Sequence, residues 1–294
     1  MQYTRADKGA WYDMYPPVVS RYAGQFGLSD LEELRLHPGK PALARSRRAG
    51  LLYGKIVTED EFSEVIFEIC DHSLHAHFDT INEGYIAYKG LRVGICGRAV
   101  VTPGRGIVGV RDFTGLCFRI PGVHRGCADA AVHEFLSLKR GMLFYSPPGE
   151  GKTTVLREMI RSLASSPHNL RVSAVDTRGE LAFGCEQECG TLDLFTGYPK
   201  AKGMEIALRC FAPQVIVCDE IGAAEAQALL FSASCGVPIL ASAHAATLPQ
   251  LLASPPIAKL HEAGIFGCYA ALRRRSGGIS FTFTERDSLV GVSN

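Results

Sequence analysis

A stretch at residues 146–154, Ser-Pro-Pro-Gly-Glu-Gly-Lys-Thr-Thr, narrows the folds open to this chain more than any other. An apolar run of strand type, Met142–Tyr145, comes directly before it, and apolar residues at helical spacing follow from Val155 to Ala164. A strand, a glycine loop and a helix in that order form the setting of a phosphate-binding P-loop. The sequence therefore predicts a nucleotide-binding P-loop between residues 146 and 154.

The residue types of this loop suit a bound ATP with Mg²⁺. Glycine lets backbone N–H groups turn inward around phosphate oxygens, and the following helix directs its positive end at the same anion. Lys152 is expected to reach the β- and γ-phosphates, Thr153 to ligate Mg²⁺, and Thr154 to lie beside the α-phosphate. The expected nucleotide-binding residues are Ser146, Pro147, Pro148, Gly149, Glu150, Gly151, Lys152, Thr153 and Thr154.

One residue of the loop departs from the usual pattern, G-x-x-x-x-G-K-[ST]. Ser146 stands where that pattern has its first glycine. Serine is small, although it disfavours a positive φ, so we interpret Ser146 as a tolerated variant. The alternative is a Gly-Lys-Thr that occurs by chance in a surface turn.

Composition and charge exclude several classes of protein. The 294 residues are 47% apolar and 21% charged, which is enough for a packed core in one large domain or two ordinary ones. A net charge of +1 offers no bulk attraction for nucleic acid, so no nucleic-acid partner is expected. Residues 1–5 lack the start of a signal peptide, and no apolar window is long enough for a spanning helix. We expect a cytoplasmic protein.

Two groups of potential metal ligands are better explained without a metal. Cys185 and Cys189 form a close pair with no matching second pair, and other cysteines (Cys96, Cys117, Cys218) lie in apolar runs where Cys acts as a small hydrophobe. The histidines at 72, 75 and 77 have no carboxylate or cysteine set to complete a site, and we interpret them as loop or helix-end residues.

The first half of the chain predicts a small α+β domain. Thr58 and Glu61 fit a capping box that opens a helix running to about residue 72. Lys89-Gly90 predicts a hairpin turn. The expected elements are helices over 28–36, 58–72 and about 74–78, and strands over 51–56, 83–88, 91–100 and 117–120. We place the N-terminal domain at 1–127 and a P-loop ATPase domain at 128–294, joined by a helix over 128–138.

From residue 141 strands alternate with helices, which predicts a parallel α/β sheet. The expected strands are 142–145, 170–176, 214–220 and 237–244, with helices over 155–164, 203–211, 223–235, 247–252 and 257–263 and a hairpin of 267–273 with 278–284. Polar residues at the carboxyl ends of such strands meet at the edge of the sheet where ligands bind.

The strand ends supply the remaining candidate catalytic residues. Asp219 and Glu220 end an apolar strand as in a Walker B motif, so we expect Asp219 to hold Mg²⁺ and Glu220 to orient and deprotonate the attacking water. The alternative is a strand followed by a helix N-terminus, where acids are favoured anyway. Asp176 ends the preceding strand and Arg178 follows it closely, and His244, at the end of the next strand, could respond to the γ-phosphate.

The chain resembles the stage III sporulation protein AA family, which belongs to the secretion-type ATPases of the RecA-like P-loop class. The stretches that carry the resemblance are 93–100, 126–128, 146–154, 175–180, 197–204 and 213–222. The resemblance implies a RecA-like P-loop NTPase domain of α/β class with a smaller N-terminal α+β domain. It also implies a mother-cell cytoplasmic ATPase, a homo-oligomeric and hexameric ring, that energises or gates a transenvelope channel during endospore formation. Membrane proteins of that channel would be its partners.

The same resemblance assigns further residues and leaves an alternative open. It matches 176–180 to an acidic Asp box and 242–244 to a His box, and arginines of the N-terminal domain would approach nucleotide, with Arg98, Arg111 and Arg119 as candidates. Leu192 stands where an arginine is expected, and Thr177 where an acid is usual. Ser146 and Leu192 favour the alternative function, a nucleotide-binding scaffold at the base of the channel that does not hydrolyse ATP, whereas intact Lys152, Thr153, Asp219 and Glu220 argue against it. A nucleic-acid motor is a weaker third possibility.

Overall fold

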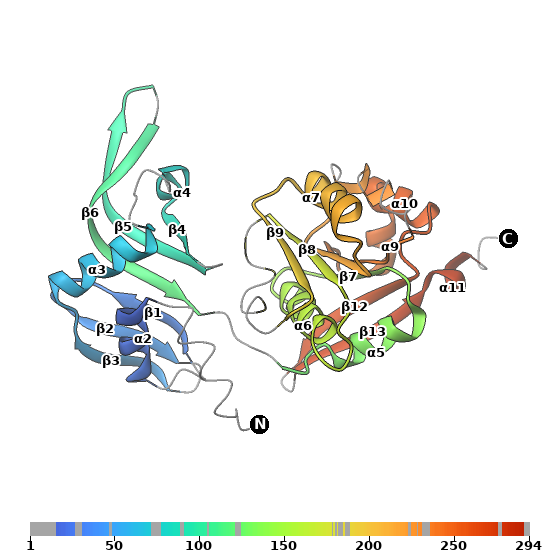
Figure 1. Cartoon of the computed structure of the whole chain (residues 1–294), viewed down its shortest axis with the longest axis horizontal. Helices are drawn as coiled ribbons and strands as arrows, with labels where there is room; N and C mark the ends of the chain where they lie inside the picture. The colour runs from blue at the N-terminus through green and yellow to red at the C-terminus, as the bar shows by residue number, and fades with distance from the viewer. Residues whose placement is uncertain are drawn as a thin grey trace. The chain divides into compact units, whose positions relative to one another are not determined.

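The chain folds into two units, Met1–Gly122 and Val123–Asn294, which are described separately (Figure 1). The two units divide after residue 122, whereas the domain boundary expected from the sequence lies after residue 127. The computed structural model describes residues 16–26, 31–46, 49–71, 78–88, 91–104, 106–120, 125–177, 179, 181, 185, 189–222, 225–227, 229–230, 236–275 and 278–290.

The described residues of the N-terminal unit form an antiparallel sheet and the short helices α2, α3 and α4. Its strand order is β3-β2-β1-β6-β5-β4. The strands are β1 (Leu31–Leu36), β2 (Pro41–Ser46), β3 (Gly50–Ile56), β4 (Tyr85–Tyr88), β5 (Leu91–Thr102) and β6 (Gly106–Arg119), and the helices are α2 (Pro17–Gly24), α3 (Glu59–Ile69) and α4 (Phe78–Asn82).

Some predictions for this unit are confirmed and one is wrong. The capping box of Thr58 and Glu61 opens α3, and β4 pairs with β5 as the expected hairpin. The helix predicted over 28–36 is wrong for its described part, because Leu31–Leu36 is strand β1. Leu31 and Leu34 have the spacing of a helical face, whereas Leu34 and Leu36 have the alternation of a strand. The segment forms a strand because it pairs with β2 and β6. The histidines at 72, 75 and 77 lie outside the described residues.

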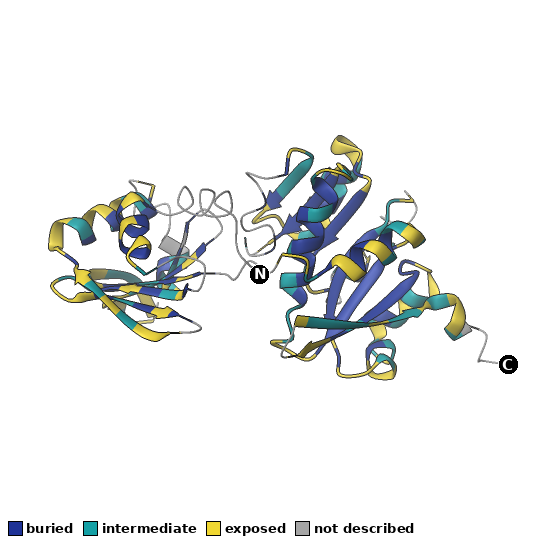
Figure 2. Cartoon of the chain, turned by 90° about the horizontal axis from the view of Figure 1, so that it is seen from below, coloured by how far each residue is buried: buried dark blue, intermediate teal, exposed yellow. Residues whose placement is uncertain are grey.

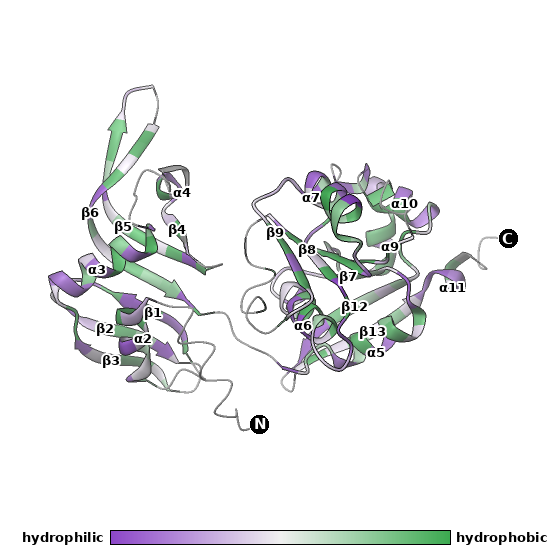
Figure 3. Ribbon diagram, in the orientation of Figure 1, coloured by the Kyte–Doolittle hydropathy of each residue, from purple (hydrophilic) through white to green (hydrophobic). Residues whose placement is uncertain are grey.

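Strands β5 and β6 are longer than the sequence pattern predicts. The expected strand at 117–120 is only the end of β6, since glycine, threonine and aspartate interrupt the apolar pattern over 109–115. The two strands extend into a ribbon with exposed apolar side chains at Val100, Val101 and Ile107. Figure 3 shows hydrophobic segments along this ribbon.

The C-terminal unit has a seven-stranded sheet in the order β13-β12-β7-β11-β10-β8-β9. All its neighbouring strands are parallel except β12 with β13. The strands are β7 (Met142–Ser146), β8 (Val172–Asp176), β9 (Leu192–Thr196), β10 (Val215–Cys218), β11 (Ile239–His244), β12 (Cys268–Arg275) and β13 (Gly278–Glu285). This confirms the predicted parallel α/β pattern, to which the structure adds β9.

Helices cover both faces of this sheet. One core cluster packs α5 (Asp129–Leu138) and α6 (Lys152–Ala164) on one face, and a second packs α7 (Lys200–Ile206), the π-helical turn Ala207–Phe211, α9 (Leu248–Leu252) and α10 (Pro255–Glu262) on the other. The central strands are buried (Figure 2). A last helix, α11 (Arg286–Val290), follows β13, while most of the helix expected over 223–235 lies outside the described residues. Within the described ranges no helix is long and apolar enough to cross a membrane.

Candidate active site

The P-loop joins the carboxyl end of β7 to the first turn of α6. Gly149 and Gly151 have φ values of 81° and 103°, in the region that favours glycine, and α6 begins directly afterwards at Lys152. Ser146 is the last residue of β7 and lies outside the positive-φ region, so the backbone here does not require glycine. The loop therefore has the geometry of an anion-binding turn at a helix N-terminus.

Lys152 is the buried cation of this loop. Its side chain is folded back so that Nζ donates to the carbonyl oxygens of Ser146 at 2.8 Å and Pro147 at 3.1 Å. The hydroxyl of Ser146 also lies 3.3 Å from Nζ, so the replacement of glycine brings a further oxygen to the lysine. Lys152 is only 7% exposed, and burial lowers the pKa of its ammonium.

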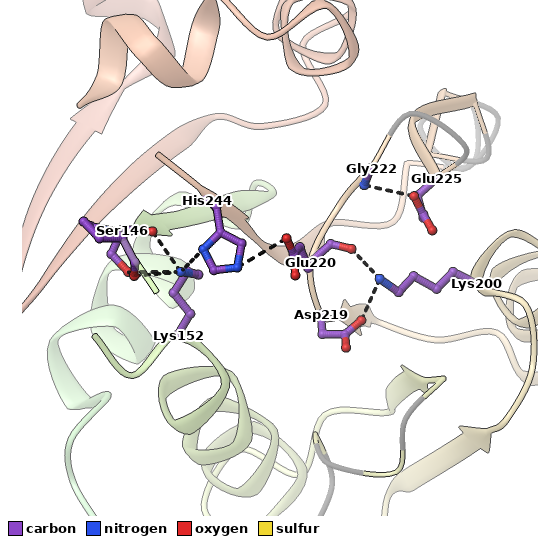
Figure 4. A network of polar contacts seen from close by, with 9 residues as sticks. Ser146, Lys152, Lys200, Asp219, Glu220, Gly222, Glu225 and His244 are labelled. Carbon is purple, nitrogen blue, oxygen red and sulfur yellow. Dashed lines mark hydrogen bonds and ion pairs between the residues drawn. The ribbon is translucent and has the colours of Figure 1, made fainter. Parts of the chain in front are cut away.

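His244 connects the P-loop lysine to the acid at the end of β10. Strand β11 places His244 opposite Ser146 of β7, at the same edge of the sheet. The imidazole Nδ1 lies 3.0 Å from Lys152 Nζ, and Nε2 lies 3.3 Å from Glu220 Oε1 (Figure 4). An ammonium only donates, so Nδ1 has to accept and the ring proton belongs on Nε2, which points at the carboxylate.

Asp219 lies beside Glu220 and already has a cation as its partner. Lys200, the first residue of α7, places Nζ 2.7 Å from Asp219 Oδ1 and also donates to the backbone oxygen of Glu220. The two side chains of this ion pair are 12% and 17% exposed. Sequence reasoning assigned no role to Lys200, although it lies inside the 197–204 stretch of the family resemblance.

The other predicted site residues lie in different parts of this edge. Thr153 and Thr154 are half-buried in the first turn of α6. Asp176 ends β8 and is buried, and its Oδ2 accepts a hydrogen bond from Leu181 N at 2.6 Å, which ties it to the loop after the strand. Arg178 lies outside the described residues.

The P-loop is also anchored to the hairpin of β12 and β13. Glu150 Oε2 accepts a hydrogen bond from Arg274 N at 2.6 Å. A Cβ atom added at Gly151 would lie 2.9 Å from Ile279 Cδ1, so this hairpin packs directly against the loop. The sequence contains no spacing that predicts these contacts, because they depend on the order of strands in the sheet.

The oxygen ligands present suit Mg²⁺. A threonine hydroxyl at 153 and the carboxylate of Asp219 are hard oxygen ligands, and Asp219 already accommodates a positive charge. Mg²⁺ in phosphate sites needs only one or two protein carboxylates, because water and phosphate complete its shell.

Comparison with known proteins identifies the family and agrees with the fold. The family model "Sporulation stage III, protein AA" matches residues 22–289. The stage III sporulation protein AA of Bacillus subtilis (strain 168) is 28% identical over 260 residues, which cover 84% of each chain.

Among solved structures, the ATPase DotB of Legionella pneumophila superposes with a TM-score of 0.61 at 18% identity, over 94% of this chain and 84% of that one. The pilus retraction motor PilT superposes with a TM-score of 0.60 at 15% identity, over 92% and 82%. These likenesses show a RecA-like fold of the kind found in secretion and pilus ATPases. Since the family model spans most of its length, the chain belongs to the sporulation stage III protein AA family.

Proposed function

We propose that this protein is an Mg²⁺-dependent ATPase whose P-loop, Walker B acids and His244 act together at the carboxyl edge of the C-terminal sheet. The observation that carries the proposal is the continuous contact from Lys152 through His244 to Glu220, with Asp219 next to it. The imidazole of His244 thus contacts both Lys152, the cation that would bind phosphate, and Glu220, the carboxylate that would take a proton from water. Phosphoryl transfer mainly requires such placement and charge neutralisation.

The P-loop would bind the triphosphate through backbone N–H groups at the start of α6. Lys152 would then give up its contacts with the carbonyl oxygens of Ser146 and Pro147 and donate to the β- and γ-phosphates instead. That exchange is favourable because charged phosphate oxygens are stronger acceptors than neutral carbonyls. Thr153 and Asp219 would hold Mg²⁺, which when bound supplies charge neutralisation on the phosphates.

Glu220 would act as the general base. Its side chain is half exposed, so water reaches it, and its Oε1 lies 3.3 Å from His244 Nε2. That contact holds the carboxylate toward the P-loop and leaves its second oxygen for the attacking water. Asp176 would support the site by fixing the loop after β8, and Arg178 remains a proposed participant.

We further propose that the ATPase works as a homo-oligomeric, hexameric ring. It would lie in the mother-cell cytoplasm, docked on membrane proteins, and would energise or gate a transenvelope channel during endospore formation. This rests on membership of the family and on a fold like that of DotB and the motor PilT. Exposed arginines of the N-terminal unit, Arg98, Arg111 and Arg119, are candidates for residues that act across ring subunits.

Phosphate release by the purified full chain with Mg-ATP, over a range of protein concentration, tests the proposal. Activity should rise faster than protein concentration, because a ring must assemble. Glu220→Gln should lower turnover by about 100-fold or more while nucleotide still binds, since it removes only the base. Lys152→Ala should abolish turnover. A Lys152→Ala protein that hydrolyses ATP at the parent rate contradicts the proposal.

A second candidate function, a nucleotide-binding scaffold that does not hydrolyse ATP, is favoured by one observation. The carboxylate expected to hold the metal, Asp219, is already paired with the ammonium of Lys200. In this case ATP would order the ring without being consumed. Tight binding of ATP with no phosphate release by the assembled ring would support the scaffold over the enzyme.

A further inference from the structure

Lys200 contacts both the carboxylate of Asp219, which is proposed to hold the metal, and the main chain of Glu220, the proposed general base. Its Nζ lies 2.7 Å from Asp219 Oδ1 and donates to the carbonyl oxygen of Glu220, the next residue (Figure 4). One cation therefore contacts both the Asp219 carboxylate and the Glu220 main chain.

The local fold delivers Lys200 to this place. Pro199 is the N-cap of α7 and Lys200 its first residue, and the preceding turn is held by a hydrogen bond from Thr177 Oγ1 to Tyr198 O at 3.1 Å. Beside the ion pair lies a pocket of about 500 Å³, whose lining includes Thr177, Pro199, Lys200, Asp219, Glu220 and Glu225. The ammonium thus lies at the wall of a cavity, where a long flexible side chain has room to move.

Two close cations would compete for the single negative charge of Asp219. The carboxylate expected to hold Mg²⁺ has the Lys200 ammonium 2.7 Å from its Oδ1, and a second cation bound to the same carboxylate would repel that ammonium at a site this little exposed. The lysine ammonium can move away when Mg²⁺ binds, because it is carried on a flexible stem of four carbons.

We propose that Lys200 is an internal competitor of the metal. It holds Asp219 and the Glu220 carbonyl while no Mg-nucleotide is bound, and Mg²⁺ has to displace it. This rests on the proposed function, and it adds that metal binding is coupled to release of the Lys200 side chain from the two residues that follow β10. The coupling makes the site bind metal more weakly than its ligands alone would.

Substitution of Lys200 tests this coupling. Lys200→Met removes the competing charge, and Lys200→Gln removes the charge but keeps a donor for the Glu220 carbonyl. Lys202→Met is the matched control, since Lys202 lies on the same helix, is 59% exposed and pairs with Glu205 at 3.1 Å. Binding of Mn²⁺ is followed by electron paramagnetic resonance with a non-hydrolysable ATP analogue, and binding of a fluorescent ATP analogue is measured in EDTA.

We expect both Lys200 variants to bind Mn²⁺ about tenfold more tightly than the parent, as removal of an antagonistic coupling of ordinary size would give. Analogue affinity in EDTA and all values for Lys202→Met should stay at the parent level. Unchanged or weaker Mn²⁺ binding overturns the proposal. So does a loss of analogue affinity in EDTA, which would make Lys200 a phosphate ligand in place of the arginine missing at Leu192.

The two proposals fail in different ways. If the parent releases no phosphate but the Lys200 variants bind Mn²⁺ more tightly, the proposed ATP hydrolysis is contradicted and the proposed competition between Lys200 and the metal is supported. If the analogue does not bind at all, the nucleotide function fails, and Mn²⁺ binding to the protein alone decides the competition by the same comparison. Near-ultraviolet circular dichroism of each variant in EDTA identifies a variant that is misfolded, and Lys200→Gln then carries the test.

Discussion

The Nδ1 atom of His244 lies 3.0 Å from Nζ of Lys152, although 92 positions separate the two residues in the chain. Strand β11 brings them together, because it pairs with β7 so that His244 lies opposite Ser146. The contact requires an unprotonated Nδ1, which places the ring proton on Nε2, toward Glu220. A movement of the Lys152 ammonium can therefore shift the His244 ring and, through it, the Glu220 carboxylate.

This relationship predicts that His244→Ala lowers kcat more than it changes KM for ATP. The variant keeps the phosphate cradle but loses the group that holds Glu220 toward the P-loop, so we expect a fall in kcat of about 100-fold. His244→Gln, which can both accept and donate, should recover part of the loss. Steady-state phosphate release measures both constants.

The control for this prediction is His133→Ala, because His133 is exposed on α5. It should leave both kcat and KM at the parent values. A His244→Ala enzyme with unchanged kcat would mean that the imidazole only fills space between two strands.

Much of the site was predictable because each strand ends in its own local signal. The P-loop, the Asp219-Glu220 pair and His244 each follow an apolar run, and parallel strands bring their carboxyl ends to one edge. The lateral order of the strands was not predictable, since it depends on which strands pair edge to edge. The contact of Lys152 with His244 and the anchoring of Glu150 to Arg274 both depend on that order.

Lys200 and strand β1 show two different limits of the sequence pattern. Lysine after proline at a helix start is ordinary, so nothing in the local sequence marks Lys200 as the partner of Asp219. The leucines of residues 31–36 fit either a helix or a strand, and the hydrogen bonds that decide come from β2 and from β6, some 80 residues away along the chain.

Burial of Lys152 predicts a cost to stability. Burial lowers the pKa of its ammonium from the ordinary 10.5, so the folded protein disfavours the proton relative to the unfolded chain. That cost is fully present below the folded pKa and is relieved as the pH rises toward 10.5. Lys152→Met should therefore be more stable than the parent near neutral pH, with a gain that shrinks as the pH rises.

Urea unfolding at a series of pH values measures this difference. Lys202→Met, a change at an exposed lysine, should leave the free energy of unfolding close to the parent value at each pH. A Lys152→Met protein that is less stable than the parent at neutral pH would mean that the hydrogen bonds to Ser146 and Pro147 outweigh the cost of burial.

The P-loop glycines predict two different penalties. Gly149 and Gly151 both have positive φ, but a Cβ at Gly149 has no neighbour within 4 Å, whereas one at Gly151 would lie 2.9 Å from Ile279 Cδ1. Gly149→Ala should cost about 1–2 kcal/mol from backbone strain alone. Gly151→Ala should cost more, because the hairpin side chain must also move.

A double-mutant cycle separates the two terms. Adding Ile279→Ala to Gly151→Ala should remove the steric excess and leave only the strain, while adding it to Gly149→Ala should give an additive loss. Each cycle compares the free energies of unfolding in urea of the parent, the two single variants and the double variant. Equal coupling in the two cycles would contradict a direct clash between the loop and the hairpin.

The buried pair of Glu158 and Arg161 on α6 predicts a large effect on stability. Arg161 Nη1 donates to Glu158 Oε2 at 2.6 Å, and Glu158 Oε1 accepts from Gly126 N at 2.9 Å, with both side chains 6% exposed. Glu158→Ala removes the carboxylate and leaves the guanidinium buried without it. We expect a loss of about 3 kcal/mol in the free energy of unfolding in urea.

The matched comparison is Glu205→Ala, which removes the carboxylate of two exposed ion pairs, with Lys202 and Arg209, and should change stability little. The double change Glu158→Met with Arg161→Met should recover most of the loss, since apolar side chains of similar volume replace a buried pair at little net cost. A double variant as unstable as Glu158→Ala would mean that the hydrogen bond to Gly126 N, and not the ion pair, holds α6 to the start of the C-terminal unit.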